Sequence, residues 1–326
     1  MVVITGVSGL VGGNLARALL AQGQKVRGLI HRGRRALQGL KMELVQADVR
    51  DPASLFHALK GAEVVYHLAG SISLELDSWT EVEAINVQGT RNVVDACLQC
   101  RVKRLVHFSS IHALEQEPLD VPLDESRRRV SPSKKLPPYD LSKAAGEMEV
   151  HNGIRRGLDA VILNPTAIVG PYDYTPSYFG RAIIALVKGR IPALVAGGFD
   201  WVDVRDVVQA ALRAEQIALS GASYILSGHW HSVRQVADMV AELTGTRAPR
   251  LSAPIGLAYL AAPAMAMLAR FNRSQPFYTW VTLRALRSNQ MISHARATRD
   301  LDYQPRPFRE TLADTLSWFA RHGYLD

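Results

Sequence analysis

The first residues of this 326-residue chain constrain its fold most strongly. Met1–Thr5 is a short apolar run, and glycines follow it at steps of three, at Gly6, Gly9 and Gly12. Leu10–Gln22 then shows the spacing of a helix. Gly6 permits a tight turn, Gly9 lets backbone N–H groups approach a diphosphate, and Gly12 packs the helix on the strand. We therefore expect a dinucleotide cofactor at the N-terminal end of this helix, where the helix dipole favours negative charge.

Short strands and longer helices continue to alternate after this loop. The expected strands are Lys25–Ile30, Leu44–Ala47, Glu63–Leu68, Leu105–Phe108 and Ala160–Leu163, and the expected helices are one capped by Asp51 with Pro52 at its first position, Asn86–Leu98 and Pro138–Arg156. This alternation predicts an α/β fold, a Rossmann-type doubly wound parallel sheet with helices on both faces.

The alternation becomes less regular after residue 170, where we expect a smaller, mostly helical C-terminal lobe. The predicted boundaries are 1–170, with 201–226 returning to it, for the NAD(P)-binding domain, and 171–200 and 227–326 for a discontinuous substrate lobe. We expect Trp201–Ala214 to be a helix and Ala222–Leu226 to be a late strand. A ligand of such a fold binds at the carboxyl edge of the sheet, facing the lobe.

Composition excludes several classes of protein. The net charge is +8, but the basic residues are spread along the chain without interleaved aromatics, so we favour a basic surface over nucleic-acid binding. Two cysteines, Cys97 and Cys100, exclude a disulfide framework and a two-pair zinc site, and we expect no metal. No apolar run reaches the roughly 18–20 residues of a spanning helix. We expect a soluble, cytoplasmic protein.

One apolar stretch has two interpretations. Residues 254–269 carry no charge and are followed by Arg270 and Arg273. We favour a helix packed in the lobe. The alternative is an amphipathic lid that touches lipid while the protein takes up an apolar substrate.

The end of the second strand indicates which dinucleotide binds. NAD-binding proteins usually carry an acidic residue there for the ribose hydroxyls, whereas this chain has Ile30 and His31. Arg32, Arg34 and Arg35 follow, and a guanidinium matches a 2′-phosphate in charge and geometry. The sequence favours NADP, with NAD as the alternative.

A tyrosine and a lysine four residues apart suggest proton transfer. Tyr139 and Lys143 share one face of the expected helix, and the preceding strand ends at Ser109-Ser110. A free phenol with a pKa near 10 exchanges protons poorly at neutral pH, but a neighbouring ammonium stabilises the phenolate. A serine hydroxyl at the strand end can hold the substrate oxygen. The other interpretation is a surface pair on an amphipathic helix.

With these motifs, the chain resembles the extended short-chain dehydrogenase/reductase family, also called the NAD-dependent epimerase/dehydratase family. The supporting motifs, in family order, are Thr5–Gly12, Asp48, His67-Leu68-Ala69-Gly70, Asn86-Val87-Gln88-Gly89-Thr90, Ser109-Ser110, Tyr139–Lys143, Asn164-Pro165 and Gly170-Pro171. The resemblance implies that Tyr139 is the acid/base, that Lys143 binds the nicotinamide ribose and tunes Tyr139, and that Ser110 orients the carbonyl.

Two sets of binding residues accompany the resemblance. The expected cofactor contacts are Gly6, Ser8, Gly9, Leu10, Val11, Gly12, His31, Arg32, Asp48, Val49, Leu68, Ala69, Gly70, Tyr139, Lys143, Asn164 and Pro165. The expected substrate pocket comprises Ser71, Ile111, Asn164, Tyr172, Phe199 and Trp201.

Departures from the family pattern at two positions indicate which reaction the chain favours. Nucleotide-sugar dehydratases of the family carry an acidic pair where this chain has Ile111-His112, and epimerases usually carry an arginine where it has Phe199. The chain looks closest to the dihydroflavonol-reductase and 3β-hydroxysteroid-dehydrogenase branch, which acts on apolar ketones and alcohols. The alternatives are a nucleotide-sugar epimerase with tightly bound NAD(P) and a non-catalytic NADP-sensing protein.

The resemblance also implies a homodimer. The family commonly packs the helix after Asn86 and the Tyr139 helix into a four-helix bundle with a second copy. Apolar residues beyond a single stripe support this expectation, and they are Val93, Val94, Leu98, Met148, Val150 and Ile154. A two-fold dimer would cover such a patch on both copies.

We predict that the protein binds NADPH more tightly than NADH and that Arg32→Ala removes most of the difference, because the substitution deletes the cation nearest the expected 2′-phosphate. Fluorescence titration with each cofactor measures this preference. Equal affinities, or tighter binding of NADH by the unaltered protein, would contradict it.

Overall fold

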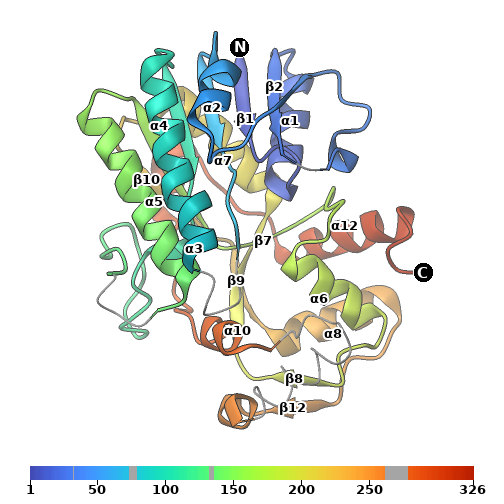
Figure 1. The fold of residues 1–326 in the computed structure, drawn as a ribbon. Coiled ribbons are helices and arrows are strands. Elements are labelled where there is room, and N and C mark those ends of the chain that lie inside the picture. Colours follow the sequence, from blue (N-terminus) through green and yellow to red (C-terminus); the bar gives the residue numbers. More distant parts are fainter. Residues whose placement is uncertain (32, 73–78, 132–135, 261–277) are drawn as a thin grey trace.

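A seven-stranded parallel sheet forms the centre of the computed structural model, which describes residues 1–31, 33–72, 79–131, 136–260 and 278–326 (Figure 1). The strands, in spatial order, are β10 (Ser223–Leu226), β6 (Ala160–Pro165), β5 (Arg104–Phe108), β4 (Val64–His67), β1 (Val2–Thr5), β2 (Val26–Ile30) and β3 (Glu43–Gln46). Each neighbouring pair is parallel. The predicted fold class is therefore confirmed.

Helices cover both faces of this sheet, as expected for parallel strands joined by helical crossovers. One core cluster packs α1 (Leu10–Ala21) and α7 (Val204–Ile217) on one face. A second cluster packs α2 (Pro52–Leu59), α4 (Gly89–Gln99) and α5 (Pro138–Arg155) on the other. The two layers are visible on either side of the sheet in Figure 1.

Local sequence signals account for the helix starts. The Asp51 side chain accepts hydrogen bonds from the backbone N–H groups of Ala53 and Ser54, and Pro52 occupies the first turn, as predicted. The segment before α4 differs from the expected single helix. It comprises α3 (Trp79–Val82) and a π-helical stretch, Glu83–Gln88.

The segment at residue 201 corrects a prediction. Residues 201–203 end strand β9 (Gly198–Asp203) and do not begin a helix. Helix α7 starts only at Val204, because Asp203 caps it by accepting the N–H of Arg205. Strand β9 pairs with β7 (Ala167–Val169) and β11 (His229–Ser232) in a second sheet of three strands.

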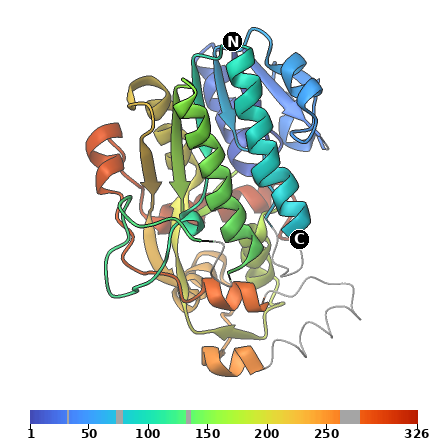
Figure 2. The same cartoon turned by 60° about the vertical axis from the view of Figure 1, so that its left-hand side comes forward.

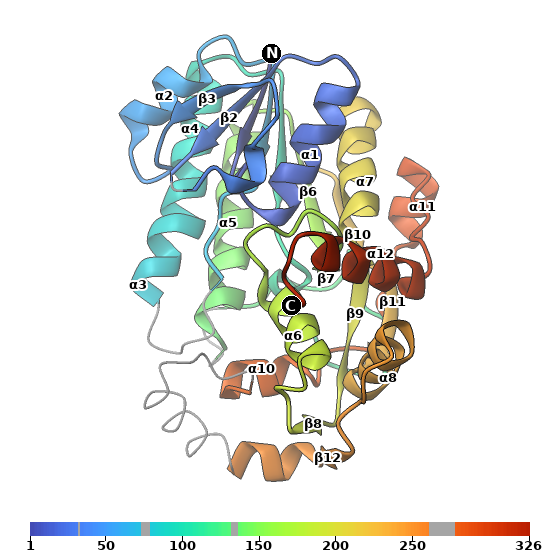
Figure 3. The ribbon, with the colours of Figure 1, turned by 90° about the vertical axis from the view of Figure 1, so that its right-hand side faces the viewer.

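Most of the C-terminal region lies at the carboxyl edge of the large sheet, whereas α11 (Ala295–Leu301) packs on α7 and β10 (Figure 3). Strands β8 (Ala193–Val195) and β12 (Leu251–Ala253) pair with each other, so the C-terminal region holds more strand than expected. The helices are α6 (Tyr178–Val187), α8 (Val233–Thr244), α10 (Trp280–Ala285), α11 (Ala295–Leu301) and α12 (Phe308–Arg321). Short 3-10 turns cover Arg35–Leu37 and Ile111–Ala113.

The helix pair α4 and α5 runs side by side along one face of the molecule (Figure 2). Of the apolar residues offered for a dimer patch, Val93, Val94 and Val150 are buried within the chain itself. Met148 is 46% exposed, and Leu98 and Ile154 are half-buried. Half of that patch therefore belongs to the core, and the dimer stays a prediction that rests on the family resemblance.

The apolar stretch 254–269 is described only in part. Residues 255–260 are helical, with Leu257 and Leu260 exposed and Ala258 buried, and residues 261–269 lie outside the described residues. Among the described residues, none of the helices combines the length and apolar character needed to span a membrane.

The glycine turn yields a stability prediction. A Cβ on Gly12 would lie 2.4 Å from the carbonyl oxygen of Gly6, whereas the nearest atom to a Cβ on Gly9 is 3.4 Å away. We expect Gly12→Ala to lower the free energy of unfolding by about 1–3 kcal/mol, because backbone must shift, even though alanine favours a helix.

Urea denaturation of the protein without added cofactor measures the change, with Gly9→Ala as the matched control. An equal loss in both variants would contradict the assigned contact between α1 and β1.

Candidate active site

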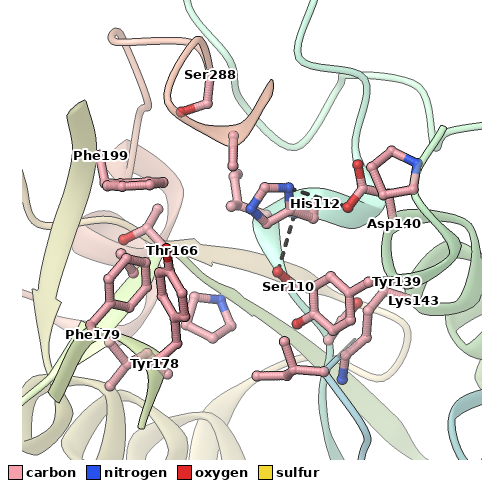
Figure 4. A pocket seen from close by; sticks show the side chains of 18 of the residues that line it. Ser110, His112, Tyr139, Asp140, Lys143, Thr166, Tyr178, Phe179, Phe199 and Ser288 are labelled. Carbon is pink, nitrogen blue, oxygen red and sulfur yellow. Dashed lines mark hydrogen bonds and ion pairs between the residues drawn. The ribbon is translucent and has the colours of Figure 1, made fainter. Parts of the chain in front are cut away.

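A cavity of about 640 Å³ opens at the carboxyl ends of the central strands (Figure 4). Its lining comes from the glycine loop, from the ends of β4, β5 and β6, from the start of α5, and from α6, β9 and α10. This is the position at which ligands of open α/β sheets bind. The predicted Rossmann half and the C-terminal region thus both line this cavity.

The floor of the cavity fits a dinucleotide. Gly6, Gly9 and Gly12 line it, together with Leu10, Val11, Leu68 and Gly70. A Cβ on Gly6 would lie 2.6 Å from the backbone nitrogen of Ala69, so only glycine lets these two loops meet. Gly9 offers no side chain to cap α1, which leaves the N–H groups of its first turn for a diphosphate.

Thr5 ties the two loops together. Its hydroxyl oxygen accepts hydrogen bonds from the backbone N–H groups of Leu68 and Ala69, both at 3.1 Å. The same oxygen lies 2.8 Å from Nδ1 of His67, and Nε2 of that ring lies 3.0 Å from the Thr90 hydroxyl. Burial lowers the pKa of His67 to about 3, so the ring is neutral and structural.

The residues expected near the adenosine form their own cluster. Arg50 binds Asp48 through both carboxylate oxygens and lowers its pKa to about 2, and Nε2 of His31 lies 3.5 Å from the same carboxylate. The Ser8 hydroxyl donates to the carbonyl of Gly33. The carbonyl of Val49 accepts from Asn92. Arg32 lies outside the described residues.

The three expected catalytic residues line the same wall of the cavity. Ser110 follows β5, and Tyr139 and Lys143 occupy the first two turns of α5. The Lys143 ammonium donates to the carbonyl of Phe108 at 3.1 Å and lies 6.0 Å from the centre of the Tyr139 ring. The structure therefore brings together residues that the sequence leaves about 30 positions apart.

Burial dominates the protonation of this group. It raises the pKa of Tyr139 to about 12, although a hydrogen bond with Ser110 acts in the opposite direction. It lowers the pKa of Lys143 to about 8, against the field of Glu147. The predicted lowering of the tyrosine pKa is not found, because desolvation of the phenolate outweighs the Ser110 hydrogen bond. A tyrosine that stays protonated at neutral pH suits proton donation.

Two buried side chains position the catalytic group. Asn164 does not line the cavity in the described structure, and it is 2% exposed. Its amide donates to the carbonyl of Ser110 at 3.1 Å and to the Glu147 carboxylate at 2.6 Å. Asn164 thus holds the serine backbone, whereas the sequence predicts a direct contact with cofactor and substrate. Pro165, its neighbour, does line the cavity.

Asn86 is a second positioning residue, and in the sequence it belongs to the motif Asn86-Val87-Gln88-Gly89-Thr90. It exchanges two hydrogen bonds with the backbone of Ser71 and donates a third to the Ser142 hydroxyl. Ser71, predicted in the substrate pocket, is held by these bonds and is not among the described lining residues. The π-helical backbone around Asn86 is the local signal that could have drawn attention to it.

Two further predicted pocket residues lie away from the cavity. Ile111 and Phe199 line the cavity, but Trp201 is 5% exposed and packs on Phe308 of α12, because that helix covers β9 beyond Phe199. The backbone turns at Tyr172, where φ is 67°. The Tyr172 ring lies outside the cavity, with its centre 4.5 Å from the Arg17 guanidinium carbon.

The opposite wall contains the predicted Phe199 and further residues that were not among the predicted site residues. Figure 4 shows Thr166, Tyr178, Phe179 and Phe199 facing the Ser110–Tyr139 wall, with Ser288 above them. Arg284, in the last turn of α10, also lines the cavity. These residues come from distant segments without a shared motif, so periodicity and spacing could not reveal them.

His112 and Asp140 also line the catalytic wall. Nδ1 of His112 lies 3.5 Å from a carboxylate oxygen of Asp140, and the His112 ring stands edge-on to Tyr139 at 6.0 Å between centres. In the sequence, His112 is notable only because Ile111-His112 stands where the family's dehydratases carry an acidic pair, and nothing in the local pattern shows which carboxylate the ring meets.

The fold and the cavity define an NAD(P)-dependent oxidoreductase of the extended short-chain dehydrogenase/reductase type. A sequence model of the NAD dependent epimerase/dehydratase family matches residues 2–224. The chain belongs to this family, which confirms the predicted resemblance.

Known proteins similar to this chain include enzymes with different substrates. It is 37% identical to the sterol demethylase protein B of Methylococcus capsulatus over 99% of each chain. It is 31% identical to a putative dihydroflavonol 4-reductase of Synechocystis, over 99% of this chain and 95% of that protein. The crystal structure of a nucleoside-diphosphate-sugar epimerase from Pseudomonas aeruginosa superposes with a TM-score of 0.80 at 26% identity, covering 100% of this chain and 99% of that one.

We expect Tyr139→Phe to keep the fold and the cofactor affinity but to lower turnover by about 10²–10⁴-fold, the usual effect of losing a general acid. Tyr139 is the only tyrosine with a lysine four residues on, so no second phenol can easily replace it. Tyr172→Phe is the matched control, because that ring lies outside the cavity. Turnover of Tyr139→Phe equal to that of the unaltered protein on any accepted substrate would refute the assignment.

Proposed function

We propose that the protein is an NADP-dependent oxidoreductase that transfers a hydride to or from an apolar ketone or alcohol. The observation that carries this proposal is the character of the cavity around the reacting group. Apolar side chains surround Ser110 and Tyr139 on several sides, and they include Ile72, Leu114, Leu136, Ile168, Phe179, Phe199 and Val281. A rigid hydrocarbon ring system would bury its surface against them favourably.

Each catalytic side chain has a defined task in this proposal. The bound cofactor supplies or accepts the hydride. The Ser110 hydroxyl oxygen accepts the N–H of His112, and the hydroxyl also hydrogen-bonds Tyr139, so the two side chains can hold one substrate oxygen together. Tyr139 donates its proton to that oxygen during reduction. Lys143, which is anchored on the Phe108 carbonyl, stabilises the phenolate that remains and binds the nicotinamide ribose.

Two relatives support an apolar substrate. Sterol demethylase protein B and the putative dihydroflavonol reductase are both named for polycyclic substrates, and both match nearly the whole of this chain. We infer that the substrate here is likewise a polycyclic alcohol or ketone. The preference for NADP rests on the residues that follow strand β2, His31 and the arginines at positions 32, 34 and 35.

Nucleotide-sugar epimerisation is the second candidate. Arg284 and Arg287 line the cavity, and an arginine can bind a diphosphate in bidentate geometry. The match to the Pseudomonas epimerase is consistent with this alternative. Phe199 stands where the family's epimerases usually carry an arginine, which favours the apolar substrate.

The test follows NADPH absorbance with 5α-androstan-3-one, flavanone and related ring ketones, and scores epimer formation from UDP-glucose and UDP-glucuronate in parallel. We expect reduction of at least one ring ketone and no epimerisation. Inert ketones together with an epimerised nucleotide sugar would replace the proposal with the second candidate.

Phe199→Ala tests the apolar wall. We expect it to raise KM for the accepted ketone about tenfold with a smaller change in kcat, because the ring contributes binding that is equal in ground and transition states. Phe56→Ala on α2 is the control, since Phe56 is not among the residues lining the cavity. An unchanged KM in Phe199→Ala would remove this ring from the substrate site.

A further inference from the structure

The pair formed by His112 and Asp140 has no role in the Ser110–Tyr139–Lys143 mechanism, although it lines the same cavity. Figure 4 shows the His112 ring between Ser110 and Asp140, on the wall from which the Ser110 and Tyr139 side chains face the hollow. The imidazole therefore lies beside the place where the substrate oxygen is expected.

Both members of the pair are held in place by backbone structure. His112 lies in the 3-10 turn Ile111–Ala113. Ser110 caps this turn, because its hydroxyl accepts the His112 N–H at 3.2 Å. Asp140 occupies the first turn of α5 directly after Tyr139, and its side chain is only 13% exposed. The turn and the helix carry the pair together with the catalytic serine and tyrosine.

The contact assigns different tasks to the two ring nitrogens. Nδ1 faces Asp140 at 3.5 Å, and within the described part of the chain Nε2 has no hydrogen-bond partner. A carboxylate at Nδ1 fixes the orientation and tautomer of an imidazole and leaves the lone pair of Nε2 as a base. The His112 side chain is 27% exposed, so a proton on it can exchange with solvent.

Charges on neighbouring elements act on the carboxylate. Burial raises the pKa of Asp140, while His112 and Arg284 of α10 oppose that effect. The fields of His112 and Arg284 offset part of the desolvation of the Asp140 carboxylate, and a base needs that carboxylate to orient it. A carboxylate buried this deeply without a charged partner would lower the free energy of unfolding.

We propose that His112, oriented by Asp140, is a second acid–base group of the cavity and removes a proton from the carbon next to the substrate carbonyl. The proposal rests on the proposed function in one respect, that the cavity holds a ketone. It adds a second activity, enolisation, and it limits the substrates of that activity to ketones with a hydrogen on the neighbouring carbon.

The step balances without an oxidant or a reductant. The C–H bond next to the carbonyl breaks, and the proton moves to Nε2 of His112. The electron pair forms the carbon–carbon double bond of an enolate, whose oxygen receives hydrogen bonds from Ser110 and Tyr139. Reversal returns a proton from Nε2 after exchange with solvent, so in D₂O the ketone gains deuterium at that carbon.

The experiment incubates the protein saturated with NADP⁺ in D₂O with 5α-androstan-3-one or flavanone and measures deuterium in the ketone by mass spectrometry. NADP⁺ carries no hydride to donate, so exchange is measured apart from reduction. We expect exchange above the protein-free rate, lowered about 10²–10⁴-fold by His112→Gln, the range for loss of a general base. Asp140→Asn should lower exchange at least tenfold.

Reduction by NADPH, measured for the same variants, separates this role from a structural one. His112→Gln and Asp140→Asn should lose exchange by a much larger factor than reduction, whereas Tyr139→Phe should lose both. His57→Gln is the control, because His57 lies on α2 and does not line the cavity. Melting temperatures check folding, and Asp140→Asn carries the test if His112→Gln does not fold.

The outcomes distinguish the two proposals. Reduction without any exchange in the unaltered protein, or full exchange in His112→Gln, would overturn the second acid–base group and leave the oxidoreductase in place. Exchange without reduction would support the group and sink the proposed function. Absence of both with both ketones would overturn both proposals.

Discussion

The close approach of two backbone loops is the constraint on which the site depends. The turn after β1 and the end of β4 meet so tightly that a Cβ on Gly6 would lie 2.6 Å from the nitrogen of Ala69. The Thr5 hydroxyl accepts the N–H groups of Leu68 and Ala69, so the two loops are joined as well as close. This contact sets the N-terminus of α1 at the edge of the sheet, where its unpaired N–H groups form the floor of the cavity. A larger residue at position 6 would push these two loops apart before it affected any ligand.

Burial then decides the chemistry of the catalytic wall. Lys143 and Tyr139 both lie where their charged forms are poorly solvated, so the phenol keeps its proton and the ammonium holds its proton less firmly than in water. Asn164 fixes the position of Ser110, because its amide links the Ser110 backbone carbonyl to the buried Glu147 carboxylate. A serine placed in this way presents its hydroxyl without reorganising when charge develops on a bound oxygen.

The substrate side of the cavity depends on the second half of the chain. Strand β9 carries Phe199 into the hollow and, two residues later, Trp201 into the core beneath α12. Helix α10 brings Arg284 toward the wall from which Asp140 faces the same hollow. Members of the family share the nucleotide-binding half, and differences in these later elements can change the substrate while the hydride chemistry is kept.

The sequence by itself determined the parts of this protein that depend on short-range order. Three glycines at fixed steps, alternating strands and helices, and a tyrosine one helical turn before a lysine are local patterns, and they suffice for the sheet, the cofactor floor and the catalytic helix. Only the tertiary structure decided which distant residues meet. It moved Tyr172 and Trp201 out of the expected pocket, turned Asn164 from a ligand contact into a support, and placed Asp140 beside His112. Such pairings depend on crossover lengths and on how helices pack, and no periodicity along the chain records them.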